Sequence, residues 1–274
     1  MTSVARALAE ARAAGMPSLD AQLLLARVLA TTRTGLIAND DRVLSDDEGR
    51  RWTDLAARRA DGEPVAYLLG EKEFCGLMLE VRAGVLVPRP ETELLVDWAA
   101  ELLDGQTRPK VLDLGTGSGA IALALKHRWP RAAVTATDAS AIALAVAQSN
   151  AARLGLDLEF LGSPWWDDLE ARRFDLIVAN PPYVAAGDPH LAALRHEPIE
   201  ALASGADGLE ALTTIARGAL DHLEPGGWLL LEHGFDQGAA VRALLGAARM
   251  TGIATRRDLA GHDRVTGGRR RPAG

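Results

Sequence analysis

Residues 180–183, Asn180-Pro181-Pro182-Tyr183, follow an apolar run at 174–179 and carry the clearest chemical signal in the chain. The two prolines stiffen the backbone and lack N–H donors, so the carbonyls of Asn180 and Pro181 remain as acceptors. With the side-chain oxygen of Asn180, these acceptors suit the two hydrogens of an NH2 group on a planar molecule, and Tyr183 offers a face for stacking. The alternative is an ordinary proline-rich turn that ends a strand. The segment predicts a site for a planar NH2 group.

A second candidate is the glycine-rich loop Gly115-Thr116-Gly117-Ser118-Gly119, which lies between an apolar run and the helix-forming residues 120–128. Glycines let the backbone pass close to a ligand, and a helix N-terminus exposes free N–H groups at the same place. The loop also reads as Gly-x-Gly-x-x-Ala, a pattern that fits a dinucleotide. It therefore predicts a ligand cradle without identifying the ligand.

Two acids accompany the glycine loop. Asp138 ends the strand-like run 133–137, about 20 residues beyond the glycines, where a carboxylate binds two ribose hydroxyls. The alternative for Asp138 is the N-cap of the helix that follows. Asp113 interrupts an apolar strand, and a buried carboxylate needs a partner. We expect Asp113 to be ionised and either to order the loop's N–H groups or to receive a cationic end of the ligand.

The elements that must position these residues alternate along the chain. Apolar, strand-like runs occur at 111–114, 133–137, 158–161, 176–179 and 228–231, and helical patterns occur at 120–128, 141–154 and 209–223. This rhythm is typical of buried parallel strands with crossover helices. Extended residues at 253–257 and 264–266 are expected to close the sheet with a hairpin. The sequence thus predicts an α/β domain over 91–274.

Residues 1–90, which precede this domain, show different sequence patterns. Residues 1–70 show helical spacing throughout, with Ser18 and Ser45 as expected N-caps, and predict a small all-helical domain. Short extended pieces at 71–90 predict a β-hairpin linker between the two domains.

Composition excludes several classes of protein. The 30 Lys plus Arg residues against 37 Asp plus Glu residues leave a net charge of −7, so duplex nucleic acid is a poor partner. Cys75 is the only cysteine, and the six histidines lack metal-ligand spacing, so no metal site is expected. No apolar run approaches the roughly 18 residues of a membrane span, and the N-terminus lacks a signal-peptide pattern. We expect a cytoplasmic enzyme without a catalytic dyad.

Together these motifs resemble the HemK/PrmC family of S-adenosylmethionine-dependent methyltransferases. The most specific matches are Gly70-Glu71-Lys72-Glu73-Phe74-Cys75-Gly76, Val87-Pro88-Arg89-Pro90-Glu91-Thr92-Glu93, Leu229-Leu230-Leu231-Glu232-His233-Gly234 and residues 257–265. The resemblance implies a Rossmann-like class I methyltransferase domain. It further implies transfer of a methyl group to the side-chain amide nitrogen (N5) of the glutamine in the Gly-Gly-Gln motif of class 1 peptide chain release factors, which the helical domain holds.

By position, the resemblance implies that Gly115 to Gly119 wrap the methionine moiety, that Asp138 holds the ribose and that Trp165 lies by the adenine. Asn180, Pro181 and Tyr183 would be the catalytic residues, and with Pro182 they would hold the glutamine; Asn180 also lies by the cofactor. Tryptophan in such a loop is as often a packing residue as an adenine platform. Many relatives carry an acid where Pro164 stands here, which leaves Asp167 as the nearest candidate for the adenine amino group.

Three rival functions share part of this pattern. An N6-adenine nucleic-acid methyltransferase would use the same loop and the same 180–183 segment, but it needs a basic surface. A nicotinamide-dependent reductase would use the glycine loop and Asp138, but this function does not explain residues 180–183. A non-enzymatic module could bind the nucleoside and use its helices as an adaptor. We expect instead a monomeric enzyme that binds a release factor, without direct nucleic-acid binding.

Overall fold

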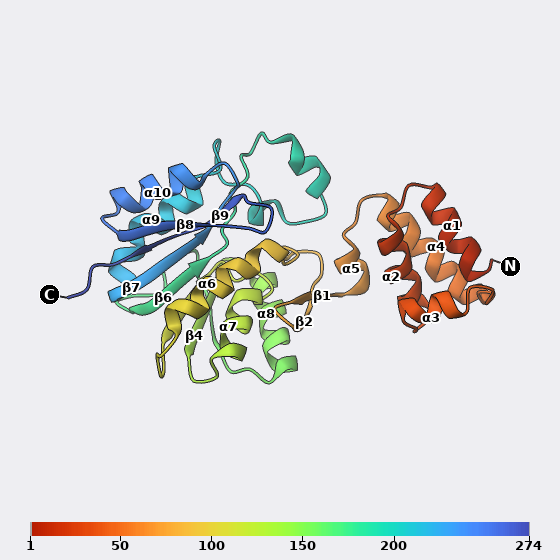
Figure 1. Ribbon diagram of the computed structural model, residues 1–274, viewed down its shortest axis with the longest axis horizontal. Coiled ribbons are helices and arrows are strands. Elements are labelled where there is room, and N and C mark those ends of the chain that lie inside the picture. Colours follow the sequence, from red (N-terminus) through yellow and green to blue (C-terminus); the bar gives the residue numbers. More distant parts are fainter. Residues whose placement is uncertain (1, 274) are drawn as a thin grey trace. The chain divides into compact units, whose positions relative to one another are not determined.

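The computed structural model describes residues 2–273, which divide into two compact units that meet at residues 71 and 72. The first unit is helical and comprises α1 (Val4–Ala13), α2 (Ser18–Val28), α3 (Arg33–Ala38), α4 (Asp46–Ala60) and α5 (Val65–Leu69) (Figure 1). The helices enclose an apolar core around Leu24, Leu25, Leu36 and Trp52.

The helix caps of this unit test two predictions. Ser45 caps α4 and forms a reciprocal capping box with Glu48, as expected. The prediction for Ser18 is wrong, because Pro17 occupies the N-cap position of α2 and Ser18 is the first helical residue. The Ser18 hydroxyl accepts a hydrogen bond from Arg12 Nε at 3.2 Å instead of capping its own helix.

The second unit is built on a seven-stranded sheet with the order β5-β4-β3-β6-β7-β9-β8. Its strands are β3 (Lys110–Leu114), β4 (Ala133–Asp138), β5 (Glu159–Gly162), β6 (Phe174–Ala179), β7 (Leu223–Glu232), β8 (Thr251–Arg257) and β9 (Asp263–Arg269). Strands β3 to β7 are mutually parallel, and β9 runs antiparallel to both β7 and β8. The predicted α/β fold and the closing hairpin are confirmed.

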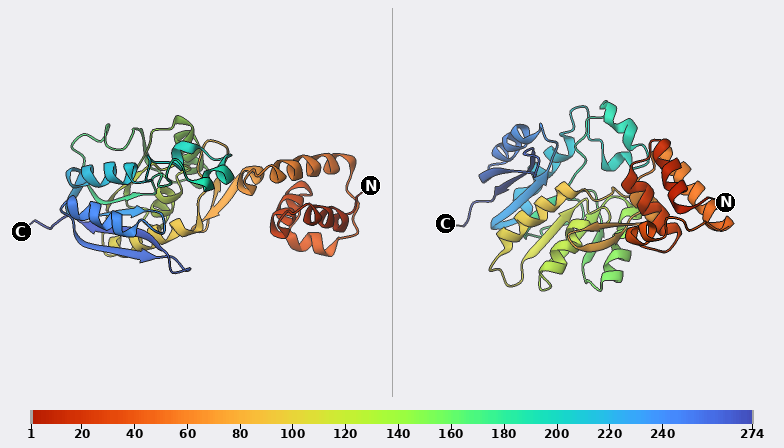
Figure 2. Two further views of the ribbon diagram at one scale, coloured as in Figure 1. Left: turned by 90° about the horizontal axis from the view of Figure 1, so that it is seen from above. Right: turned by 45° about the vertical axis from the view of Figure 1, so that its right-hand side comes forward.

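Helices cover both faces of the sheet (Figures 1 and 2). One face carries α6 (Glu93–Leu103), α7 (Ala120–Arg128) and α8 (Ala141–Leu154), and the other carries α9 (Glu210–His222) and α10 (Gly238–Ala247). The strands are apolar because both of their faces are buried, and a separate apolar cluster lies on each side. The arrangement brings the carboxyl ends of β3, β4 and β6 to one edge, where open α/β sheets bind ligands.

The hairpin of β1 (Glu71–Phe74) and β2 (Leu77–Glu80) packs into this second unit. The side chain of Asn150 on α8 binds both the amide nitrogen and the carbonyl of Glu80. Residues 72–90 therefore belong to the larger compact unit. Not all of the short extended pieces expected within 71–90 are strands: residues 85–87 form a loop, with Val85 and Val87 buried, that leads to the 3-10 helix η1 (Pro90–Thr92).

Strand β7 is longer than the predicted run 228–231, because Leu223 already pairs with Phe174 on β6. The register then shifts before Leu176 pairs with Trp228. Between β6 and α9 the chain forms a long loop that contains the 3-10 helices η2 (Pro189–Leu194) and η3 (Ile199–Ala201). None of the helices within residues 2–273 has the length and apolar character of a membrane span.

Candidate active site

The glycine loop turns the chain from the end of β3 into α7. Gly115, Gly117 and Gly119 have φ angles of 72°, 57° and 85°, in the left-handed region that favours glycine. The amide nitrogens of Gly115 and Thr116 both donate to the Thr137 carbonyl at 2.9 Å, which ties the loop to the end of β4. The loop is therefore held against the neighbouring strand end.

Asp138 bridges the glycine loop and the start of α8. Its Oδ2 accepts from the amide nitrogen of Gly117 at 2.8 Å, and its Oδ1 accepts from that of Ser140 at 2.8 Å. Burial raises the pKa of this carboxyl, while the two backbone hydrogen bonds lower it. The alternative interpretation of Asp138 as a helix N-cap is wrong, because Ser140 caps α8 through its hydrogen bond from Ala143.

Asp113 lies beneath the loop and not in the pocket that the loop lines. Its Oδ2 accepts from the Thr116 hydroxyl at 2.6 Å and from the amide nitrogen of Ala122 at 3.1 Å. Burial raises the pKa of this carboxyl to about 7. Asp113 therefore orders the Thr116 side chain of the loop and the first turn of α7, whereas the sequence led us to expect bonds to the N–H groups of the loop itself. Burial therefore opposes the ionised form that we expected from the sequence.

Asn180 follows β6 directly and faces the glycine loop across the carboxyl edge. Its amide nitrogen Nδ2 donates to the Thr92 hydroxyl at 3.1 Å. The side-chain oxygen of Asn180 is therefore the amide atom left for a ligand. Pro181 is buried and Pro182 is half-buried next to it.

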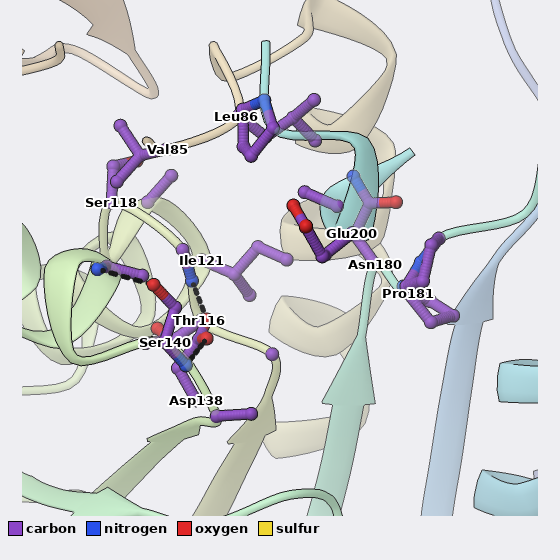
Figure 3. Close-up of a pocket in the computed structure, with 18 of the residues that line it drawn as sticks. Val85, Leu86, Thr116, Ser118, Ile121, Asp138, Ser140, Asn180, Pro181 and Glu200 are labelled. Atoms are coloured by element: carbon purple, nitrogen blue, oxygen red, sulfur yellow. Dashed lines mark hydrogen bonds between the residues drawn. The ribbon is translucent and has the colours of Figure 1, made fainter. Parts of the chain in front are cut away.

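These residues line one pocket of about 400 Å³, a volume typical of small-molecule sites. Its walls include Gly115, Thr116, Gly117, Ser118, Asp138, Trp165, Asn180, Pro181 and Pro182. Figure 3 shows Thr116, Asp138 and Ser140 grouped on one side of the pocket, with Asn180 and Pro181 on the other. The fold thus brings together three segments that are well separated in the sequence.

Two of the predicted site residues lie behind the pocket wall. A Cβ on Gly119 would point at Leu123 and Ala147, so this glycine permits close packing of the helices. The Tyr183 ring packs against the apolar cluster beneath α9, and its hydroxyl donates towards Glu232 Oε1 at 3.4 Å. Neither residue is among those that line the pocket.

Trp165 forms part of the pocket wall in a left-handed conformation, with a φ of 52°. The edge of its ring lies 3.5 Å from the Cβ position of Gly115, so a side chain there would touch the indole. Ser163 and Pro164 line the same wall. Asp167 is exposed and lies outside the pocket lining, so the interpretation of this acid as a contact to the adenine is not supported.

Sequence reasoning missed three residues that support the site. Thr92 holds Asn180, and the buried carboxylate of Glu197 binds the loop at 87–89. Glu232 ends β7 and is 1% exposed. Glu232 had the same signal as Asp113, an acid in an otherwise apolar strand. Glu197 had no such signal, because the loop between β6 and α9 in which it lies shows no pattern that marks it.

Comparison with known proteins shows which families this chain matches. The PrmC N-terminal domain family matches residues 2–70, and the Methyltransferase small domain family matches residues 91–232. A release factor glutamine methyltransferase of Bordetella pertussis is 51% identical over 93% of this chain and 95% of its own length. The chain belongs to the HemK/PrmC family. A release factor glutamine methyltransferase of Burkholderia pseudomallei is 49% identical, with 94% of each chain covered.

Solved structures support the fold of this HemK/PrmC chain. A T. thermophilus 16S rRNA N2 G1207 methyltransferase, solved with AdoMet and guanosine, has a TM-score of 0.57 at 22% identity, over 73% of this chain and 50% of its own. The hMettl16 catalytic domain has a TM-score of 0.58 at 18% identity, over 78% and 81%. The class I methyltransferase fold expected from the sequence is thereby confirmed.

Proposed function

We propose that this protein transfers a methyl group from S-adenosylmethionine to the side-chain amide nitrogen (N5) of a glutamine in a class 1 release factor, within the Gly-Gly-Gln motif. The observation that carries this proposal is the position of Asn180 and Pro181 opposite Asp138 across one pocket, in a chain of this family. Acceptors for an NH2 group and a carboxylate suited to a ribose then share a single cavity.

The residues of the pocket fit S-adenosylmethionine, the cofactor of this family. Gly115 and Gly117 line the wall without side chains that would fill the space, and Gly117 has nothing within 4 Å of its Cβ position. Asp138 would accept from the ribose hydroxyls, and Trp165 would lie against the adenine. The donor supplies a methyl group that its sulfonium charge already activates.

The residues of the chain would act by orienting the glutamine amide of the substrate. An amide nitrogen is a weak nucleophile, because its lone pair is delocalised into the carbonyl. The side-chain oxygen of Asn180 and the carbonyl of Pro181 would each accept one N–H of the glutamine, which raises the electron density on nitrogen and aims it at the methyl group. Tyr183 would support the segment from behind. The extra proton of the product nitrogen is acidic and leaves to water, so no strong base is needed.

The charge of −7 supports a protein partner over a nucleic acid. We further propose that the chain acts as a cytoplasmic monomer. The N6-adenine methyltransferase alternative is not favoured, since relatives named for release factor methylation match over nearly the whole chain.

The test is to incubate the protein with labelled S-adenosylmethionine and with a release factor, DNA or neither, and to locate the label by mass spectrometry. We expect one methyl group on a release factor glutamine and none on DNA. Asn180→Ala should lower turnover about 10²- to 10³-fold, since one preorganised polar contact is lost, while cofactor binding persists. Gln106→Ala, at the opposite edge of the sheet, is the matched control. Label on DNA, or weakened cofactor binding with full turnover in Asn180→Ala, would overturn the proposal.

A further inference from the structure

Glu200 is an acid of the pocket wall to which the mechanism above assigns no role. Of the described residues that line the pocket, only Asp138 and Glu200 carry a charge, and both are acidic. The carboxylate of Asp138 already accepts from the amide nitrogens of Gly117 and Ser140. The Glu200 side chain is exposed and forms no hydrogen bond or ion pair with another described residue. The carboxylate of Glu200 is therefore available to a ligand.

The position of Glu200 within the pocket is visible in Figure 3. Its side chain extends into the cavity between Ile121, on the side of the glycine loop, and Asn180, in the substrate segment 180–183. In the proposed function, the methyl donor binds on the first side and the glutamine amide on the second. The charged sulfur of the donor and the glutamine nitrogen must therefore meet in the part of the pocket that Glu200 lines.

Hydrogen bonds hold the short helix η3, which carries Glu200, on both sides. Three residues before Glu200, the buried Glu197 side chain accepts from the amide nitrogen of Val87 at 3.0 Å. Two residues after it, the carbonyl of Leu202 accepts from the amide nitrogen of Val184 at 2.9 Å. Val184 directly follows the substrate segment, so the fold ties Glu200 to the two loops between which it lies.

The charge of the ligand changes in the proposed reaction. The sulfur of S-adenosylmethionine is a sulfonium cation, whereas S-adenosylhomocysteine, which remains after the methyl group has moved, has a neutral thioether at the same position. The ammonium and carboxylate groups of the methionine moiety are the same in both molecules. A carboxylate close to the sulfur therefore attracts the donor more strongly than the product, by an energy that depends on distance and on shielding by water.

We propose that Glu200 is a specificity-determining residue that makes the pocket prefer the cationic donor, S-adenosylmethionine, over the neutral product, S-adenosylhomocysteine. This inference rests on the proposed function, in which the pocket binds the donor for methyl transfer. Asp138 has a different role, because the ribose that it would hold is common to donor and product. Glu200 thus weakens the binding of the spent cofactor relative to that of the donor that replaces it.

Calorimetric titration of the protein with each of the two molecules tests this preference without any turnover. Glu200→Gln removes the charge at nearly constant size and should raise the Kd of S-adenosylmethionine about three- to tenfold, as expected for a charge pair partly shielded from water. The Kd of S-adenosylhomocysteine should stay within about twofold of wild type. Glu200→Lys reverses the charge and should raise the Kd of the donor further. Asp167→Asn, which removes an exposed acid outside the pocket lining, is the matched control and should change neither Kd.

The salt dependence of the Kd distinguishes an effect of charge from an effect of shape. Raising the ionic strength from about 0.1 M to about 1 M shortens the Debye length from roughly 10 Å to roughly 3 Å. The Kd of S-adenosylmethionine should therefore rise more steeply with salt for the wild type than for Glu200→Gln, so that the two values approach each other. If Glu200 acted through its shape alone, the ratio of the two Kd values would be the same at both ionic strengths.

The outcomes distinguish a failure of this inference from a failure of the proposed function. A wild-type protein that binds S-adenosylmethionine but does not methylate a release factor contradicts the proposed function, whereas the titrations still measure the preference. Equal increases of both Kd values in Glu200→Gln would mean that the carboxylate holds a group common to donor and product, and would overturn the inference. Unchanged Kd values for both molecules in Glu200→Gln would overturn it as well.

Discussion

Arg89 and Glu197 form an ion pair at 2.5 Å that joins two walls of the pocket. The Glu197 side chain is 2% exposed and also accepts from the amide nitrogen of Val87 at 3.0 Å. The segments on either side of this pair, 85–88 and 198–201, both contribute lining residues. The pair therefore holds together two loops that are far apart in the sequence and that do not pair with each other as strands.

We expect Glu197→Gln to weaken this connection, because the amide keeps the bond to Val87 but loses the charge-assisted bond to Arg89. The free energy of unfolding should fall by about 1–2 kcal/mol, and the cofactor Kd should rise several-fold. Chemical denaturation and calorimetric titration measure the two effects. Glu10→Gln, which breaks the exposed pair with Arg6, is the control and should change stability by less than about 0.5 kcal/mol. Equal effects of both variants would contradict the assignment.

Asp138→Ala should weaken cofactor binding and leave kcat at saturation nearly unchanged. Two ribose hydroxyls would lose a charged acceptor, worth roughly 1.5 to 3 kcal/mol, or about 10- to 100-fold in Kd. Calorimetry gives the Kd directly. Asp167→Asn removes a charge of the same sign from the exposed end of the neighbouring loop and should leave the Kd as it was. An unchanged Kd in Asp138→Ala would limit Asp138 to holding Gly117 and Ser140.

Gly119→Ala should destabilise the protein by about 1–3 kcal/mol through strain and overpacking. The residue has a φ of 85°, and an added Cβ would lie 2.9 Å from Leu123 Cδ1 and 3.1 Å from Ala147 Cβ. Gly105→Ala separates the two causes, since Gly105 has a φ of 77° but nothing within 4 Å of its Cβ position. Denaturation should show a smaller loss for Gly105→Ala; equal losses would mean that the close contacts contribute nothing.

Asp113 should give the stability a characteristic pH dependence. Burial raises the pKa of this carboxyl from 3.8 to about 7, so the folded state binds more protons than the unfolded state between these values. Its contribution to the free energy of unfolding is full below the lower value and is lost as the pH rises to the upper one. Relative to wild type, Asp113→Asn should therefore gain up to about 1 kcal/mol per pH unit between pH 5 and 7 and level off above.

Denaturation curves at several pH values measure this difference. The amide also changes the bonds to Thr116 and Ala122, but that offset does not vary with pH. Asp97→Asn removes a charge from an exposed position and controls for the change in net charge. A difference between Asp113→Asn and wild type that stays constant from pH 5 to 8 would show that Asp113 keeps one protonation state.

The helical unit should carry substrate specificity. A glutamine amide occurs in nearly every protein, so selection has to come from contacts remote from the pocket. A protein that begins at Glu71 retains the sheet, the glycine loop and Asp138, and should bind S-adenosylmethionine with wild-type affinity. It should methylate an intact release factor far more slowly than the full chain, as measured by transfer of labelled methyl groups. A short Gly-Gly-Gln peptide should be a poor substrate for both proteins, and equal rates on the intact factor would leave the helices a purely structural role.

Sequence patterns were sufficient to predict features that depend on interactions between residues close together in the sequence. The alternation of apolar runs and helical spacing predicted the strands and helices of the larger unit, since a parallel strand buried on both faces must be apolar along its length. The Ser45 cap was predictable for the same reason, because its partner Glu48 lies three residues away. Ser18 was not, since the choice between cap and first helical residue depends on Pro17 and on Arg12 in the preceding helix.

The sequence by itself determined the chemistry available at the carboxyl edge: the glycine loop, the acid after the second strand and the acceptors of Asn180 and Pro181. Only the tertiary structure decided which supporting residues hold them. Thr92 binds Asn180 from 88 positions away, and Glu197 binds Arg89 across 108 positions. Such contacts leave no periodic signal, because their partners are far apart in the sequence and become neighbours only in the folded chain.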